Sequence, residues 1–267
     1  YIGGLEVYKQ ILFKYPKNIR LNEEIKKKIK KFRVFVQPTF SQTQIDKFFE
    51  LHKLGKTNLV IQTLNDAFKS NQDNVLSISL LGTFLAMNED YVEAIKFQKI
   101  AVEKAPFETP FYLNLSETLI LINRLEESLS TLYFAKVLSL NDKSIDYKLA
   151  KIHTKLKNYL KADLIYQELI KEDNVASEII YDYCDNLIRS SKAKEAILFL
   201  EKYELKNPKD EQVKVIIGFA YYNIKQYKTA KNILLEVTKS NNYNEKALTV
   251  LGDCYEQLGD LDQAKSY

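Results

Sequence analysis

The chain has 267 residues, of which 46% are hydrophobic, and it carries a formal net charge of +4 at pH 7. This apolar content, with 18 Tyr and 14 Phe, is enough for a sizeable core and excludes a globally disordered chain. Only 7 Gly and 5 Pro, with few alternating Val-rich segments, favour an all-helical fold over a sheet protein.

The first 40 residues are predicted to contain a partial repeat, a basic helix and a connector. Residues 1–16 have the spacing of a single helix that ends at Pro16, because proline cannot donate an internal hydrogen bond. Apolar residues then recur at helical spacing along a lysine-rich stretch: Leu21, Ile25, Ile29 and Phe32. A connector over residues 37–40 follows, and Ser41 with Gln44 predicts a capping box that begins the next helix.

Positive charge is concentrated in this N-terminal stretch. Residues 14–33 contain nine Lys or Arg against two Glu, a local charge of +7, so the remaining residues carry a small net negative charge. Such a cluster can be the electrostatic footprint of a nucleic-acid-binding protein. The chain has few arginines, however, and none alternates with aromatic residues here. We therefore interpret the cluster as the solvated face of an amphipathic helix packed on the following array, and we do not expect a nucleic-acid partner.

A 34-residue unit, seen most clearly at residues 177–210, repeats along the rest of the chain. Its first half has one apolar helix face: Ile180, Tyr183, Cys184 and Leu187. After a polar turn at residues 190–192, its second half has another such face, and Pro208 ends it: Ala193, Ala196, Leu200 and Tyr203. Neither helix can bury its apolar face alone, so stability requires stacked neighbours. We predict one uninterrupted array over residues 41–267, with repeats at 41–74, 75–108, 109–142, 143–176, 177–210, 211–244 and 245–267, the last one cut short.

The spacing and residue types of these units resemble those of the tetratricopeptide repeat (TPR) family. The repeat at 75–108 carries the large, small and proline residues of the family pattern: Ile78, Leu81, Gly82, Leu85, Tyr91, Ala94, Ala101 and Pro106. Gly218 and Gly252 keep the same glycine position in the last two repeats. The resemblance implies an all-α fold, an α-α superhelix of antiparallel helix pairs. It also implies a concave groove, lined by the first helices, that binds a partner peptide or protein.

Applied to this chain, the groove positions of the family select residues from the central repeats. The candidates for partner binding are Asn114, Tyr147, Lys148, Lys151, Tyr181, Asp182, Asp185, Ile216, Phe219 and Tyr222. Four apolar residues, at 215, 216, 219 and 222, are expected to be exposed, and an exposed apolar patch often marks a partner site. The alternative is that superhelix curvature or a neighbouring repeat covers them.

No pattern in the sequence predicts catalysis, a cofactor or a metal site. There is no HExxH motif, no paired CxxC and no glycine-rich phosphate loop. The two histidines are His52 and His153, and His153 takes a core position of its repeat, so we expect a packed ring rather than a general base. We therefore predict that these residues bind rather than catalyse, without a cofactor or a metal.

The expected compartment is the cytoplasm. Cys184 and Cys254 cannot form a disulfide framework, and both lie at packed positions, which indicates thiols in a reducing compartment. No apolar run reaches the length of a membrane span, and no signal peptide is recognisable, so no membrane partner is expected. The chain begins at Tyr1 and ends within a predicted repeat, so we expect the natural protein to extend at both ends.

Two functions fit this organisation. The first is a protein-interaction scaffold whose groove holds an extended or helical segment of another protein. The second is the non-catalytic, substrate-recruiting part of a larger bacterial enzyme. Over about 65 N-terminal residues the chain has a half repeat, then a short connector, then the first full repeat. This order resembles that of bacterial TPR proteins whose arrays precede a sulfotransferase or glycosyltransferase domain.

Overall fold

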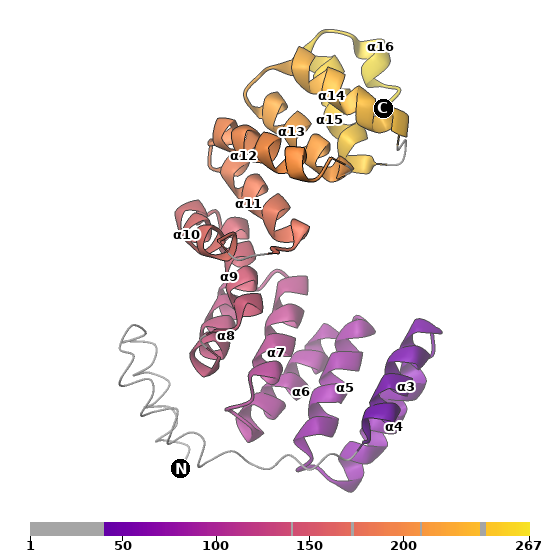
Figure 1. Cartoon of the computed structure of the whole chain (residues 1–267). Coiled ribbons are helices and arrows are strands. Elements are labelled where there is room, and N and C mark those ends of the chain that lie inside the picture. The colour runs from indigo at the N-terminus through magenta and orange to yellow at the C-terminus, as the bar shows by residue number, and fades with distance from the viewer. Residues whose placement is uncertain (1–39, 140, 172–173, 209, 241–243) are drawn as a thin grey trace, which may run out of the picture. The chain divides into compact units, whose positions relative to one another are not determined.

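The computed structural model describes residues 40–139, 141–171, 174–208, 210–240 and 244–267 (Figure 1). The partial repeat and the basic helix predicted within residues 1–39, together with most of the connector, lie outside the described residues. Within the described ranges the chain forms 14 α-helices and no β-strand, which confirms the predicted all-α fold.

The helices alternate between the first and the second helix of each repeat. The first helices are α3 (Gln42–Lys53), α5 (Val75–Met87), α7 (Thr109–Leu121), α9 (Lys143–Lys155), α11 (Ser177–Arg189), α13 (Glu211–Asn223) and α15 (Glu245–Gln257). The second helices are α4 (Thr57–Ser70), α6 (Tyr91–Lys104), α8 (Leu125–Leu138), α10 (Tyr159–Leu169), α12 (Ala193–Lys206), α14 (Tyr227–Ser240) and α16 (Leu261–Ala264). From α5 on, every first helix begins at the first residue of a predicted 34-residue repeat.

The chain divides into two compact units, and the division falls between Leu149 and Ala150, inside α9. The sequence predicted an array without such a division. In the first unit α5 packs on α6 and α7 on α8, and α4 also packs on α5 of the next repeat. In the second unit α11 packs on α12, α13 on α14, and α14 on α15 of the next repeat. Each unit therefore buries the apolar helix faces between sequential neighbours, as stacked repeats require.

A left-handed backbone conformation ends every first helix at the same repeat position. The residues with positive φ there are Gly55, Glu89, Asn123, Lys157, Ser191, Lys225 and Gly259. The N–H of the following residue donates back to the helix, as Lys192 does to the carbonyl of Leu187 at 2.8 Å, which caps the helix. Glycine adopts this conformation without strain, whereas other residues do so at a cost of about 1 kcal/mol. The polar turn predicted at residues 190–192 is one of these caps.

Small residues allow the two helices of a repeat to approach closely. Cys184 of the first helix and Ala196 of the second, which the sequence placed on the apolar faces, are both fully buried. At Gly218 a Cβ atom would lie 2.7 Å from Cγ of Leu234, so a larger residue would clash with the second helix. The glycine of the family pattern is thus explained by packing.

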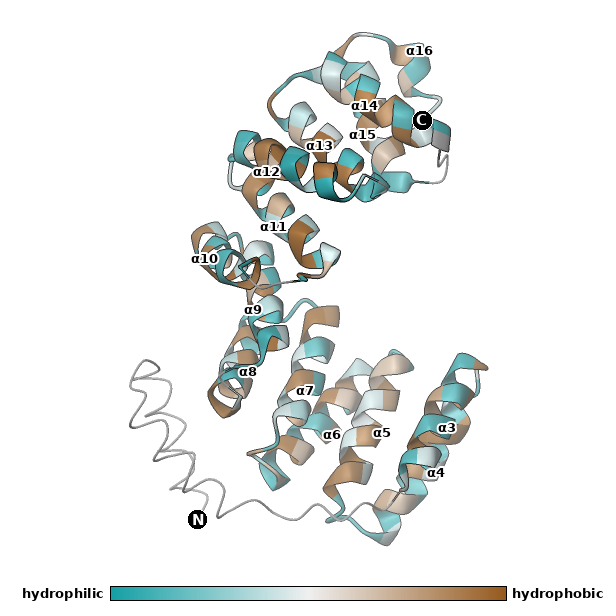
Figure 2. Ribbon diagram, in the orientation of Figure 1, coloured by the Kyte–Doolittle hydropathy of each residue, from teal (hydrophilic) through white to brown (hydrophobic). Residues whose placement is uncertain are grey.

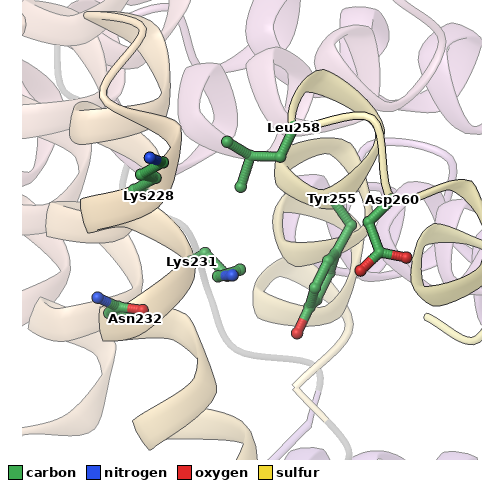
Figure 3. Close-up of a pocket in the computed structure, with 6 residues that line it drawn as sticks. All are labelled: Lys228, Lys231, Asn232, Tyr255, Leu258 and Asp260. Atoms are coloured by element: carbon green, nitrogen blue, oxygen red, sulfur yellow. The ribbon is translucent and has the colours of Figure 1, made fainter.

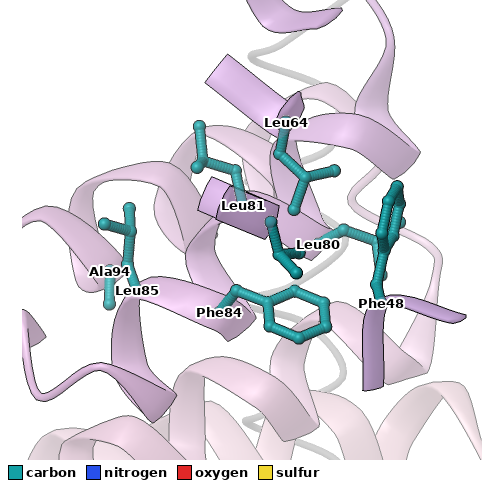
Figure 4. Close-up of a cluster of buried hydrophobic side chains, with 8 residues drawn as sticks. Phe48, Leu64, Leu80, Leu81, Phe84, Leu85 and Ala94 are labelled. Carbon is teal, nitrogen blue, oxygen red and sulfur yellow. The ribbon is translucent and has the colours of Figure 1, made fainter. Parts of the chain in front are cut away.

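The core of the first unit begins with aromatic residues of α3 and α5 (Figure 4). Phe84 is fully buried, and its ring packs against Phe48 and Phe49 with centroid distances of 6.3 and 5.0 Å. The predicted capping box is present: the backbone N–H of Ser41 donates to Gln44 Oε1, and the N–H of Gln44 donates to Ser41 Oγ. Along the helices, hydrophobic residues alternate with hydrophilic ones (Figure 2), as amphipathic helices around a shared core require.

Candidate functional site

The polar groove candidates of the first unit contact the neighbouring first helix. Asn114 on α7 is half-buried, and its Nδ2 donates to Thr83 Oγ1 on α5 at 3.2 Å. Lys148 on α9 forms an ion pair with Glu117 of α7. Tyr147, also on α9, is half-buried. Asn114 and Lys148 therefore connect successive repeats, and a ligand would compete with these contacts.

Three charged candidates of the second unit also form ion pairs. Lys151 on α9 and Asp182 on α11 form an ion pair across neighbouring first helices, with 3.2 Å between Nζ and Oδ2. Asp185 accepts a hydrogen bond from the guanidinium of Arg189, one turn along α11. Partly exposed pairs of this kind contribute little stability each, so their effect is mainly to orient the side chains.

Tyr181 is held against the end of its own repeat. Its hydroxyl donates a hydrogen bond to Oδ2 of Asp210, the residue that precedes α13. Burial raises the pKa of Tyr181 above its ordinary value, and the hydrogen bond to the Asp210 carboxylate raises it further. The phenol therefore stays neutral and acts as a hydrogen-bond donor within the chain.

The apolar row on α13 is not exposed as predicted. Val215 and Ile216 are buried, at 0% and 2% exposure, so the expectation for these two residues is wrong. Val215 packs in a core cluster with Ala247 and Leu251 of α15. The covering of these positions by a neighbouring repeat was the alternative considered above. Ile216 therefore has no surface to offer a partner in this structure.

Phe219 and Tyr222 remain half-buried at the edge of that cluster. They lie three residues apart on α13, so both are on one helix face. The Lys246 ammonium of α15 lies 5.0 Å from the centroid of the Phe219 ring, a cation–π contact. Tyr222 packs at 5.5 Å from Tyr227. The two aromatic rings thus combine partial exposure with a fixed position, which is typical of contact surfaces.

The two histidines occupy packed sites. His153 is 1% exposed on α9, as the sequence predicted for a core position. Nδ1 of His52 lies 2.9 Å from Thr57 Oγ1, and its ring lies near Phe84. The described residues contain no group of three or more His, Cys, Asp or Glu side chains that could hold a metal ion.

We expect the burial of His153 to make stability depend on pH. Burial lowers the pKa of His153, and the charge of Lys161 lowers it further. The folded state thus binds this proton less readily than the unfolded state, whose ordinary histidine pKa is about 6.5. Neutral His153 therefore makes its full contribution to the free energy of unfolding above that pH. The contribution is lost as the pH falls below it, by at most about 1.4 kcal/mol per pH unit. Urea unfolding of the wild type and of His153→Phe, at about pH 7.5 and about pH 5.5, measures this loss as the change in their stability difference. The prediction would be contradicted if the difference in unfolding free energy between the two proteins were the same at both pH values, or if it favoured the wild type more at the lower pH.

Both cysteines are buried and free, as predicted. Burial raises the pKa of the Cys184 thiol to about 12 and that of Cys254 to about 11. The reactive thiolate is therefore scarce at neutral pH, and both residues pack as small apolar side chains.

A polar cleft, which the sequence did not predict, lies in the second unit between α14 and the turn from α15 to α16 (Figure 3). Its volume is about 350 Å³. It is lined by Lys228, Lys231, Asn232, Tyr255, Leu258 and Asp260. Lys231 and Asn232 come from one wall, and Tyr255 faces them from the other. Lys231 could have indicated this cleft from the sequence, because four of the other repeats have Ile or Leu at its repeat position: Ile61, Ile95, Leu129 and Ile197.

None of the helices in the described ranges has the length and apolar character needed to cross a membrane.

Comparisons with known proteins agree with the repeat fold. Residues 245–267 match the family model described as tetratricopeptide repeat. No curated protein sequence matches the chain significantly. A tetratricopeptide repeat protein from Parabacteroides merdae ATCC 43184 is similar in structure, with a TM-score of 0.74 and 13% identity over 82% of this chain and 87% of that chain.

Two further solved structures show the same arrangement. The pilF protein of Pseudomonas aeruginosa has a TM-score of 0.55 and 15% identity, over 72% of this chain and 88% of that chain. A thermophilic TPR protein from Thermus thermophilus has a TM-score of 0.52 and 19% identity, over 68% of this chain and 98% of that chain. At these identities the similarity shows the fold alone, which is that of TPR structures. The resemblance of the N-terminal segments to sulfotransferase or glycosyltransferase proteins stays a prediction.

Proposed function

We propose that this chain is a protein-interaction scaffold, and that Phe219 and Tyr222 on α13 contact a peptide segment of its partner. The fold supports the proposal, because stacked helix pairs present extended surfaces that such proteins use for binding. The observation that carries the choice of site is the partial exposure of two aromatic rings on one face of α13.

The chemistry of the aromatic pair suits a peptide ligand. Aromatic side chains supply a large contact area with few rotatable bonds, and they are enriched among the residues that dominate binding energy. Lys246 holds a positive charge beside the Phe219 ring. In contrast, Lys151, Asp182 and Asp185 are engaged in ion pairs, so they would contribute less to a new contact.

We further propose that the chain acts by binding and not by catalysis. The residue types that most often serve as base or nucleophile are used for packing: His153 and both cysteines are buried. The neutral, buried state of the Cys184 and Cys254 thiols supports the same conclusion.

Replacing both aromatic residues with alanine tests the site. A phage-displayed library of random peptides is selected on the wild-type chain, and the selected peptides are measured by isothermal titration calorimetry. Phe219→Ala/Tyr222→Ala should weaken their binding by about tenfold or more, because truncation removes the ring contacts. Because both rings pack on the core, we also expect the free energy of unfolding to fall by about 1–3 kcal/mol, so binding is measured where circular dichroism shows a folded chain.

A matched control uses exposed apolar residues elsewhere in the same unit. Leu198 and Leu205 on α12 are 61% and 85% exposed, and their replacement by alanine should change affinity by less than about twofold. Equal binding by the wild type and the aromatic variant would place the site elsewhere. Failure of any peptide to be enriched over an unrelated folded protein would refute the peptide-binding function itself.

A further inference from the structure

Two charged residues line the cleft, Lys231 and Asp260. The residues at the same repeat positions two repeats earlier form an ion pair. Lys231 corresponds in the 34-residue repeat to Asp163, and Asp260 corresponds to Lys192. Asp163 and Lys192 form an ion pair with 2.9 Å between Oδ2 and Nζ, and Asp163 is only 7% exposed. At that location the chain supplies its own carboxylate and closes the space between the helices.

The corresponding charges at the cleft are reversed and do not meet. Among the described residues neither Lys231 nor Asp260 has an ion-pair partner within 4.0 Å. The Lys231 ammonium lies 5.1 Å from the centroid of the Tyr255 ring instead. The Asp260 carboxylate accepts a hydrogen bond from the backbone N–H of Gln263 at the start of α16. Its role in capping that helix leaves Lys231 without a counter-charge.

We propose that this cleft binds a carboxylate side chain of an acidic peptide segment from a partner protein. The ammonium groups of Lys228 and Lys231 would pair with the carboxylate, and the amide of Asn232 would donate a further hydrogen bond. Leu258 and the Tyr255 ring provide an apolar wall for the stem of the acidic side chain. The volume of about 350 Å³ is at the lower end of ligand pockets and suits one or two side chains.

The charge of the second unit favours an acidic peptide over a nucleic acid. Residues 150–267 contain 18 Lys or Arg and 18 Asp or Glu, so the unit has no net charge with which to attract a polyanion over a long range. Recognition is therefore expected to be local, one carboxylate at two lysines. This cleft shares no lining residue with the proposed Phe219 and Tyr222 surface, because it is lined by residues of α14, by Tyr255 of α15 and by the turn between α15 and α16.

Fluorescence anisotropy with fluorescein-labelled hexaglutamate tests the proposal on the full chain. We expect saturable binding that weakens as salt is added, because the contact is electrostatic. Lys231→Ile restores the residue type found at Ile197 and should reduce the affinity by about tenfold or more while the chain stays folded. Lys228→Gln/Lys231→Gln removes both charges with little change in size and gives the same expected loss if the isoleucine variant unfolds. Phe219→Ala/Tyr222→Ala should retain hexaglutamate binding, which separates this site from the proposed peptide surface.

A lysine on the same helix outside the cleft gives the matched control. Lys239→Gln makes an equal charge change on α14 and should leave the affinity within about twofold of the wild type. An equal loss in the Lys239 and Lys231 variants would show diffuse attraction and overturn the proposal. Absence of measurable hexaglutamate binding by the wild type would overturn it as well. Tighter binding of a labelled single-stranded oligonucleotide of equal charge would favour a nucleic acid in place of the peptide.

Discussion

Phe84→Ala is expected to lower the free energy of unfolding by about 3–5 kcal/mol, because it removes a fully buried ring and leaves a cavity. The ring joins α3 to α5: it packs against Phe48 and Phe49, and it lies 6.3 Å from the ring of His52. Truncation thus removes transfer energy and several aromatic contacts at once. The remaining side chains around the site come from four helices, α3 to α6, and cannot collapse fully into the space (Figure 4).

The loss should be local, because each repeat contacts mainly its neighbours. Urea unfolding gives the size of the loss, and hydrogen exchange with mass spectrometry gives its location. We expect faster exchange of the amides in α3 to α6 and unchanged exchange in α11 to α15. Val92→Ala in α6 is the control, because Val92 is 80% exposed and its truncation should change stability by less than about 0.5 kcal/mol. Uniform acceleration along the whole chain would contradict the division into separately packed units.

The helices could be predicted from the sequence because their signals are local. The apolar spacing of Ile180, Cys184 and Leu187 depends on 3.6 residues per turn, and α11 begins at Ser177 as predicted. Small residues at Cys184 and Ala196 also follow from the close approach of paired helices. The turn between the helices was recognisable as polar, but its left-handed residue was not, since only two of the seven repeats have glycine there.

The candidate site was less predictable because it depends on contacts between repeats. Repeat position shows which side of its own helix pair a residue faces. It does not show how far α15 covers α13, and this packing buries Val215. Similarly, the charges of Lys148 and Glu117 were visible, but they lie 31 residues apart and pair only because α7 and α9 are neighbours. The division inside α9 has no local sequence signal that we recognise.

Comparison of one repeat position across the whole chain would have identified the cleft. That position holds Ile or Leu in four of the seven repeats, and Asp163, Lys231 and Lys265 in the other three. A charge at a packed position requires either an internal partner or a ligand. Asp163 has an internal partner in Lys192, so the strength of that ion pair can be measured directly.

Lys192→Met is expected to lower the free energy of unfolding by about 1–3 kcal/mol, because it leaves the Asp163 carboxylate buried without its partner. The Asp163 side chain is 11% exposed and that of Lys192 is 34% exposed, so only Lys192 reaches water readily. Asp163→Asn should therefore cost less than Lys192→Met, since the freed ammonium is solvated. The pKa of Lys192 is raised by the hydrogen bond and charge of Asp163. The ion pair thus makes its full contribution to folding stability below the ordinary lysine pKa of about 10.4. The contribution is lost as the pH rises through the raised pKa of Lys192.

Replacing both charged residues with apolar ones separates the energy of the ion pair from the need to fill the space that its side chains occupy. Asp163→Ile/Lys192→Met puts at this position the residue that Ile197 provides one repeat later, and we expect stability close to that of the wild type. Urea unfolding of the wild type, the two single variants and this double variant measures the comparison at neutral pH. If Asp163→Asn costs more than Lys192→Met, the buried carboxylate is not the unsatisfied group, and the prediction is wrong. A double variant as unstable as Lys192→Met would show that the space cannot be filled by an apolar side chain. In that case Lys231→Ile would not close the corresponding cleft either, and the double lysine-to-glutamine variant would be needed to test acidic-peptide binding.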